Sequence, residues 1–435
     1  MNTKQPLLRI LGFILFAFQS SVMAVDLVEL YQQSVVYDAE YAIAETNLLA
    51  EGEQVKRDQA PLLPAIQLSY SKSLNSRQED VFADQDYEDD LIVYRLTQPL
   101  FNVNRWYNFK QAQSSFKEAK KRFDAERQQL IIRVVEAYLN VLRAQENLSA
   151  TQAEEDFLIQ QLDRTNKQLK AGLASITDVH EVRATYDLVK VDHIKDKNNL
   201  RISFQVLEVL SGRAYESVQP LQQSVPIELP MPNDLEYWVT QALQNNLSLL
   251  SAKYGLEVAQ KLLRQAKGNH FPTVNLVARY TDSEGSRLSE EDFTNRSVAI
   301  EFNIPLYEGG GTKAQVRQAY YQLEESELTV KLEERTVIQE VRRLFETVAA
   351  DVSSVQAQQQ AIISNRIALK SMREGYRVGR RDIVDVLDAQ QALYGAIRDH
   401  ANAQYDYFLN RLKLYQVAGI LRRKHLVELN QLLTP

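Results

Sequence analysis

The sequence predicts a mainly α-helical protein with a smaller β part, built from two copies of one unit of long helices and strand pairs. Three observations support this. Landmark residues recur at offsets of 206 to 208 positions: Pro64 as Pro272, Pro99 as Pro305, and Gly172 as Gly379. Two long stretches lack both glycine and proline, and four short segments alternate apolar with polar residues. A repeat this long indicates one structural unit used twice.

The N-terminal segment has the pattern of a cleaved signal peptide. Lys4 and Arg9 precede an apolar run at 11–18, and small residues lead to a cut after Ala24. The alternative is an uncleaved anchor helix, but this run is short for a bilayer, and no later run is long enough to cross one as a helix. We therefore expect an exported chain with a signal peptide at 1–24.

The rest of the chain divides into two repeats and two short segments. Each repeat is expected to contain a helix, two strands, a very long helix, a hairpin tip and another long helix. A linker holding four prolines separates the repeats and reads as an irregular equatorial region, with a short counterpart at the C-terminus. The first repeat is expected at 25–210, with strands near 65–100 and a tip near 172, and the linker at 211–234. The second repeat is expected at 235–418, with strands near 273–306 and a tip near 379, and the short C-terminal segment at 419–435.

The longest helices are expected where glycine and proline are missing. These stretches, 106–171 and 312–374, hold about 66 and 63 residues. A helix of 66 residues is about 100 Å long at 1.5 Å per residue. Helices of this length imply a coiled coil or a helical tube. Apolar residues recur at helical spacing, as in Leu130, Val134 and Tyr138, so one stripe packs while the other faces are polar.

The alternating segments are expected to be strands with one apolar face. They lie at 66–70, 92–96, 274–280 and 298–304. Ordinary hairpins on a soluble core are the alternative. In a membrane, four strands cannot close a barrel and an open edge is not viable. Several chains would then share one β-barrel; two, three or more copies all satisfy this condition.

Composition excludes several classes of function. A net charge of −7 argues against nucleic acid as a partner, and the absence of cysteine excludes disulfides and thiol chemistry. The five histidines are far apart in sequence, and no nucleophile elbow or phosphate loop is visible. We therefore expect no enzyme activity, no cofactor and no metal.

Five stretches of the chain have a distinctive sequence: Gly375–Tyr394, Ala171–Val179, Asn246–Leu250, Arg264–Lys267 and Phe271–Thr273. These stretches resemble the TolC family of outer-membrane efflux and secretion channels. The similarity covers the whole mature chain, although Asp38-Ala39 and Asn246-Leu247 stand where many members carry Asp-Pro or Asn-Pro, a difference that would affect a helix start.

The resemblance implies a homotrimer in the bacterial outer membrane. Each chain would add four strands to a twelve-stranded β-barrel in outer-membrane lipid, continuous with a periplasmic α-helical coiled-coil tube. The expected partners are a periplasmic adaptor (membrane fusion) protein and an inner-membrane RND, ABC or MFS transporter. The implied function is an exit channel of tripartite efflux pumps or of type I protein secretion. The alternative from another class is an exported structural or adhesive coiled-coil protein without a pore.

The resemblance also implies a gate at the periplasmic end. Asp385 and Asp388 are three positions apart and share one helix face. Three chains would form two carboxylate rings there, which attract cations. Asp385 also fits a helix cap with Asp382, as Asp178 does with Ser175, so capping alone is the alternative for both. Asp388 lies too deep in its helix to cap it.

Closing restraints and docking tips follow from the same resemblance. Tyr376 is expected to bond Asp178, and Arg381 to reach the Thr177 region of a neighbouring chain. The alternative is that Arg380 and Arg381 are solvated charges at the tip. The tips are expected to dock the adaptor, unless their glycines serve only the turns. The tip residues are Gly172, Leu173, Ser175, Gly379 and Arg380.

Overall fold

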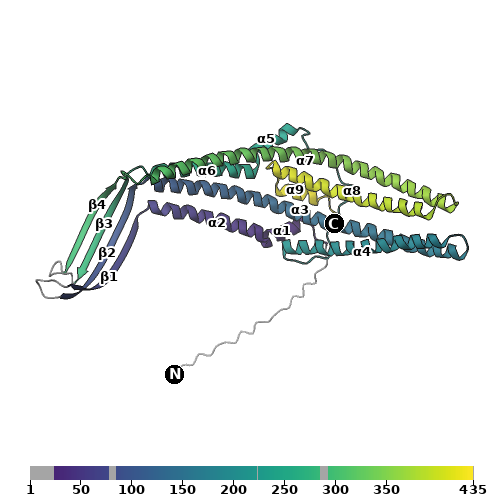
Figure 1. The fold of residues 1–435 in the computed structure, drawn as a ribbon, viewed down its shortest axis with the longest axis horizontal. Helices are drawn as coiled ribbons and strands as arrows, with labels where there is room; N and C mark the ends of the chain where they lie inside the picture. Colours follow the sequence, from purple (N-terminus) through teal and green to yellow (C-terminus); the bar gives the residue numbers. More distant parts are fainter. Residues whose placement is uncertain (1–23, 78–84, 223, 285–291, 435) are drawn as a thin grey trace, which may run out of the picture.

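The computed structural model describes residues 24–77, 85–222, 224–284 and 292–434, so nearly all of the expected signal peptide at 1–24 lies outside the described residues. The molecule is elongated, with a β-sheet at one end and two helical hairpin tips at the other (Figure 1). The predicted fold class is confirmed: the chain is mainly helical, with two similar units that each contribute two strands.

Apart from one 3₁₀ turn, the two units contain the same helices and strands in the same order. The first comprises α1 (Leu27–Tyr37), α2 (Ala39–Gln59), the 3₁₀ turn η1 (Ala60–Leu62), β1 (Ala65–Arg77), β2 (Gln85–Phe101), α3 (Val103–Lys170) and α4 (Ile176–Ser211). The second comprises α5 (Leu235–Asn245), α6 (Leu247–Gly268), β3 (Thr273–Glu284), β4 (Phe293–Asn303), α7 (Gly311–Arg377) and α8 (Ile383–Val417). A short helix, α9 (Arg423–Asn430), follows.

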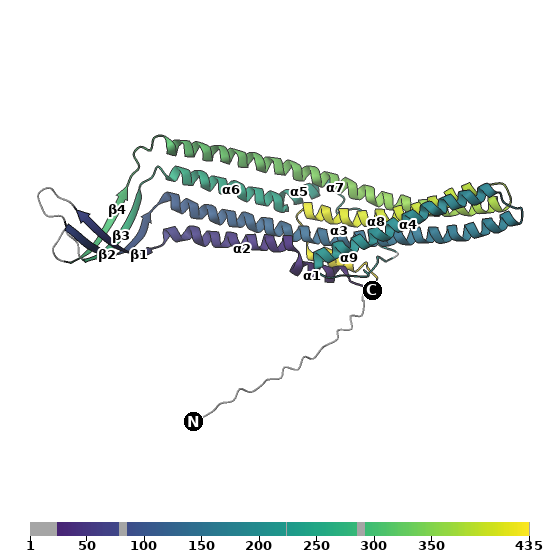
Figure 2. The ribbon, with the colours of Figure 1, turned by 60° about the horizontal axis from the view of Figure 1, so that its bottom comes forward.

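Two unbroken helices set the length of the molecule. Helices α3 and α7 contain 68 and 67 residues, which corresponds to about 100 Å each. They run from the sheet to the tips; α2 and α6 accompany them on the sheet side, and α4 and α8 on the tip side (Figure 2). None of the described helices has a stretch apolar and long enough to span a membrane.

The sheet is antiparallel with strand order β1-β2-β3-β4, so β2 and β3 join the two units. Among the described residues, β1 and β4 have no further strand partner and form open edges. One face of the sheet is apolar and exposed to solvent in the single chain. Its large exposed side chains include Ile66, Leu68, Tyr70, Tyr94, Val298, Ile300 and Phe302, which are 47 to 74% exposed.

The main hydrophobic core lies in the middle of the molecule. On α3 the residues from Leu130 to Leu142 are mostly buried, and they pack with α1, α5, α7, α8 and α9. The linker and the C-terminal segment close this region through isolated bridges, Val25 with Val218 and Leu221 with Leu433. A second, smaller core lies beneath the tips, with Leu158, Val182 and Ile383 at its centre.

Each unit has a helix break at one Asp or Asn residue. Asp38 ends α1 and begins α2, and its carboxylate accepts a hydrogen bond of 2.7 Å from the Tyr41 N–H. Asn246 does the same between α5 and α6, accepting from the Leu249 N–H at 2.9 Å. Both helices therefore start directly after the cap without the proline that many family members carry, because the Asx side chain accepts a hydrogen bond from one of the first free N–H groups.

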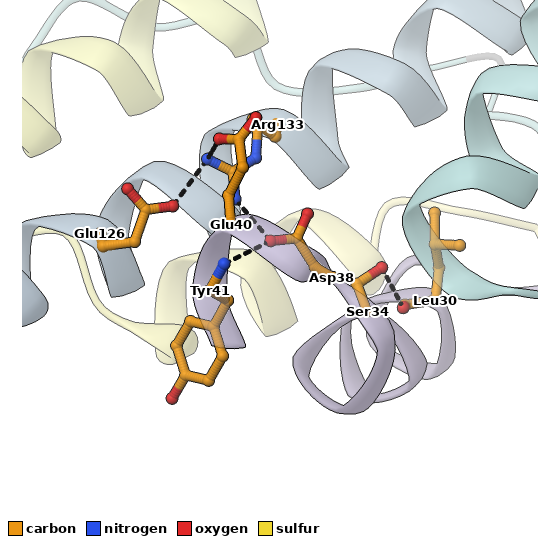
Figure 3. A network of polar contacts seen from close by, with 7 residues as sticks. All are labelled: Leu30, Ser34, Asp38, Glu40, Tyr41, Glu126 and Arg133. Carbon is orange, nitrogen blue, oxygen red and sulfur yellow. Dashed lines mark hydrogen bonds and ion pairs between the residues drawn. The ribbon is translucent and has the colours of Figure 1, made fainter. Parts of the chain in front are cut away.

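Arg133 of α3 fixes the first of these breaks (Figure 3). Its two Nη atoms lie 2.8 Å from Asp38, 2.7 Å from Glu126 and 2.8 Å from Glu40. Burial lowers the pKa of Arg133, but the hydrogen bond that it donates to Glu126 and the three negative charges outweigh this effect, so the pKa lies above its ordinary value. This cluster ties the start of α2 to the central core.

Candidate functional site

Both hairpin tips use the same turn geometry. Gly172 and Gly379 have left-handed backbones with φ of 70° and 73°. After α3, the Leu173 N–H donates to the Gln168 carbonyl at 2.8 Å; after α7, the Arg380 N–H donates to the Gly375 carbonyl at 2.9 Å. These are Schellman motifs, which favour glycine at the left-handed position. The turn alone thus requires both glycines, whatever else they do.

The helices that leave the tips start with matching capping boxes. Ser175 and Asp178 cap each other at the start of α4, with hydrogen bonds of 3.0 and 2.8 Å. At the start of α8 the Asp385 carboxylate accepts from the Asp382 N–H at 3.2 Å. Asp178 and Asp385 therefore both cap helices.

Asp388 lies one turn further along α8. It is exposed, whereas Asp385 is half-buried. Within the described part of the chain, no hydrogen bond or ion pair involves the Asp388 carboxylate, and its position rules out capping. Of the two predicted gate residues, Asp388 is therefore the one that has no interaction partner among the described residues.

Arg381 is held between α7 and α8. Its aliphatic stem lies on Gly375, where a Cβ atom would come within 2.7 Å of the Arg381 Cγ. Its Nη1 atom is 3.7 Å from the Asp385 carboxylate, in a pair whose side chains are 53 and 36% exposed. An exposed pair of this kind contributes about 0 to 1 kcal/mol. The stem contact therefore positions the guanidinium more than the charge pair does.

The expected bond between Tyr376 and Asp178 is not formed in this structure, and that expectation is corrected here. The Tyr376 hydroxyl donates to Gln168 of α3 at 3.3 Å instead, because the Asp178 carboxylate points back to cap its own helix. Burial raises the pKa of Tyr376, and the Asp178 charge adds to this increase, which indicates that the carboxylate is near the phenol. The pairing of Arg381 with Thr177 involves a second chain and stays a prediction.

Gln168 and Gly375 are site residues that the sequence reasoning missed. Gly375 is a helical glycine two positions before the end of α7, and its position beside Tyr376 was the only available signal. Gln168 had none, because it becomes a partner only when the two hairpins pack together. Arg373 was also missed: it lies over the Phe157 ring at 4.8 Å and donates to Gln390 at 2.7 Å.

The tips expose three large apolar side chains. Leu173 is 78% exposed, Val378 60% and Ile176 56%. Of these, Leu173 was among the predicted tip residues and Ile176 was not. Within the described residues, no three His, Asp or Glu side chains form a group able to hold a metal ion.

A sequence model described as "Outer membrane efflux protein" matches residues 30–213 and 238–420, most of both units. The chain belongs to the outer membrane efflux protein family. A comparison with known proteins confirms the predicted resemblance to the TolC family. The chain is 31% identical over 438 residues to the outer membrane protein TolC of Escherichia coli K12, and the match covers 98% of this chain and 88% of that protein.

Other relatives widen the comparison. The alkaline protease secretion protein AprF of Pseudomonas aeruginosa is 25% identical over 434 residues, covering 97% of this chain and 90% of AprF. The fold matches the crystal structures of CusC (TM-score 0.81, 18% identity, 92% of this chain and 93% of that chain). It also matches the CmeC outer membrane channel of Campylobacter jejuni (TM-score 0.81, 17% identity, 94% and 90%).

These findings confirm the predicted function and location. The family member described here is an outer-membrane channel of the efflux and secretion class and not an enzyme. Channels of this family work as trimers in tripartite pumps.

Proposed function

We propose that three copies of this chain form one exit duct for solutes or secreted polypeptides. The three sheets close edge to edge into a twelve-stranded barrel in outer-membrane lipid, and the helices form a periplasmic tube of about 100 Å. The duct opens when a periplasmic adaptor protein and an inner-membrane RND, ABC or MFS transporter dock to the tips.

The observation that carries this proposal is the sheet. One face presents large apolar side chains, and both edge strands expose unpaired backbone groups. In lipid, such edges each cost several kcal/mol per unsatisfied group and must be paired with another chain. Edge-to-edge closure satisfies the backbone and turns the apolar face toward the lipid.

The tips form the gate in this proposal. Asp388 from each chain points into the narrow end and forms a ring of negative charge, with a second ring from Asp385 one turn closer to the tip. Its exposure, and the lack of a partner for it in the part of the chain that the structure describes, support Asp388 as the main selectivity residue. The Tyr376–Gln168 bond links the two hairpins of one chain in the closed state, and the contact of Arg381 with Gly375 fixes the guanidinium within the second hairpin.

The exposed apolar tip residues support adaptor docking. Leu173, Ile176 and Val378 lie on the outside of both turns, where they contribute nothing to the core of their own chain. An adaptor hairpin that buries them would gain about 25 cal/mol per Å² of apolar surface. The predicted docking residues Gly172, Ser175, Gly379 and Arg380 supply the shape of this surface.

The test is single-channel recording in planar bilayers combined with the mass of the detergent-extracted protein. We expect a trimer whose small conductance is cation-selective and blocked by a trivalent cation. Asp388→Asn should relieve the block, and Glu374→Gln, an exposed tip carboxylate paired with Arg377, should not. A monomer, or a protein without conductance, refutes the channel and favours the non-porous coiled-coil alternative.

A further inference from the structure

The polar face of the sheet carries a row of side chains at one level. Strand pairing places Gln67 of β1 opposite Arg95 of β2, Arg95 opposite Arg279 of β3, and Arg279 opposite Ser297 of β4. Side chains of directly paired residues share one face, with Cβ atoms about 5 Å apart. Two arginines thus stand side by side in the middle of the sheet, with a hydrogen-bonding side chain on either flank.

This arrangement is unfavourable unless something else compensates it. Like charges directly opposite each other destabilise a strand pair. Both arginines are exposed, and within the described residues neither makes a side-chain hydrogen bond or an ion pair. The acids on the same face are distant: Asp89 is six positions from Arg95, about 20 Å, and Glu301 is four positions from Ser297, about 13 Å.

The other cations of this sheet whose side chains the structure describes differ. Lys72 is 2.7 Å from the Glu88 carboxylate, and Arg296 lies over the Tyr280 ring at 5.5 Å. Both belong to the opposite, apolar face, where Arg296 pairs with Tyr280 in the register. Among the sheet cations whose side chains the structure describes, those on the apolar face therefore have partners, and Arg95 and Arg279 on the polar face have none. A local rule broken in this way is typical of a binding site.

We propose that Arg95 and Arg279, with Gln67 and Ser297, bind anionic groups inside the duct. The ligand class is a free oxyanion or the phosphate, sulfate or carboxylate group of a passing solute, because planar guanidinium groups bind such oxygens with two parallel hydrogen bonds. This inference rests on the proposed trimer, in which the three sheets would bring six guanidinium groups to one level of the barrel. The two ends of the duct then carry opposite charge, cation-attracting at the gate and anion-attracting within the membrane.

The experiment measures block of single channels by inorganic phosphate added on the sheet side, at low salt. Bilayers of phosphatidylcholine alone exclude an anionic lipid headgroup as the source of the effect. Arg95→Gln and Arg279→Gln should each raise the phosphate concentration for half-block about fivefold, the factor expected for losing one unit-charge contact at 4 Å in water. Arg95→Lys keeps the positive charge but loses the two parallel hydrogen bonds of the guanidinium, so it should raise the half-block concentration less than Arg95→Gln does.

Arg296→Gln is the matched control, since it makes the same change of charge on the opposite face of the same sheet. It should leave phosphate block unchanged. Equal block in the wild type and in both polar-face variants overturns the inference, and so does an equal loss of block in Arg296→Gln, which would mean a general charge effect. If the wild-type protein does not conduct at all, the proposed channel itself fails, which is a different result from a conducting channel that ignores these arginines.

Discussion

The Arg133 cluster allows a quantitative test of how the start of α2 is held. Replacing Arg133 by Met removes the guanidinium and leaves a side chain of similar length. The Asp38 carboxylate, only 6% exposed, then keeps one hydrogen bond from the Tyr41 N–H and loses its charge partner. We expect α2 to open locally far more often than in the wild-type protein, while the rest of the molecule stays folded.

The magnitude follows from burial. Removing one partner of a buried ion pair costs about 3 to 5 kcal/mol. Arg133 is 19% exposed, so the lower value applies, and Glu40 adds little because it is 70% exposed. A cost of about 3 kcal/mol raises the equilibrium constant for local opening about 150-fold. No α2 side chain is fully buried in the single chain, so the packing of this helix against α3 offsets little of the loss.

Hydrogen exchange of the α2 amides, residues 39–59, measures this directly. Asp38→Ser combined with Arg133→Met should restore most of the protection, because serine caps the helix without a charge that needs a partner. Arg122→Met on the same helix, with a side chain 60% exposed, is the surface control and should change exchange little. Equal exchange in the single and double variants would refute the reasoning, since the buried carboxylate would then not be the cause.

Three further outcomes are expected at the tips. Tyr376→Phe with Arg381→Glu should raise single-channel conductance, since the tyrosine loses a bond to Gln168 worth about 1 kcal/mol and the arginine its contact with Asp385; unchanged conductance would show that these residues do not close the gate. Gly375→Ala should also raise conductance, because its Cβ would displace Arg381, and Gly395→Ala, with nothing within 4 Å, is the control. Gly172→Ala and Gly379→Ala should each speed proteolytic nicking of the tips at a cost of about 1 kcal/mol, whereas Gly→Asn should cost less; nicking at wild-type rates in the alanine variants would contradict the left-handed turns.

Much of the fold could be predicted because its signals are local. The absence of glycine and proline marks α3 and α7, and Gly172 and Gly379 mark the tips, since a left-handed residue is needed where a long helix reverses. Period-two alternation was enough to assign the apolar and polar faces of the sheet. The freedom of Asp388 also followed from its position alone, too far into α8 to cap the helix.

The contacts between the hairpins could not be predicted in the same way. Tyr376 and Gln168 are 208 positions apart, and which donor meets which acceptor depends on the rotation of two long helices about their axes. Asp178 is within reach of Tyr376, but the nearer N–H of Ser175 competes for its carboxylate and takes it. The consequence of having Ala39 instead of proline after Asp38 could not be predicted either, because Arg133, which binds the capping carboxylate, comes from another helix.

The continuity of α3 has a mechanical consequence. This helix is embedded in the central core from Leu130 to Leu142, while its end at Lys170 is about 56 Å from Arg133, 37 residues at 1.5 Å each. It acts as a lever pivoted at the middle of the molecule, so a swing of about 5° at the pivot carries the tip through about 5 Å, close to one helical turn. A docking partner that moves the tips therefore needs to disturb the central packing very little.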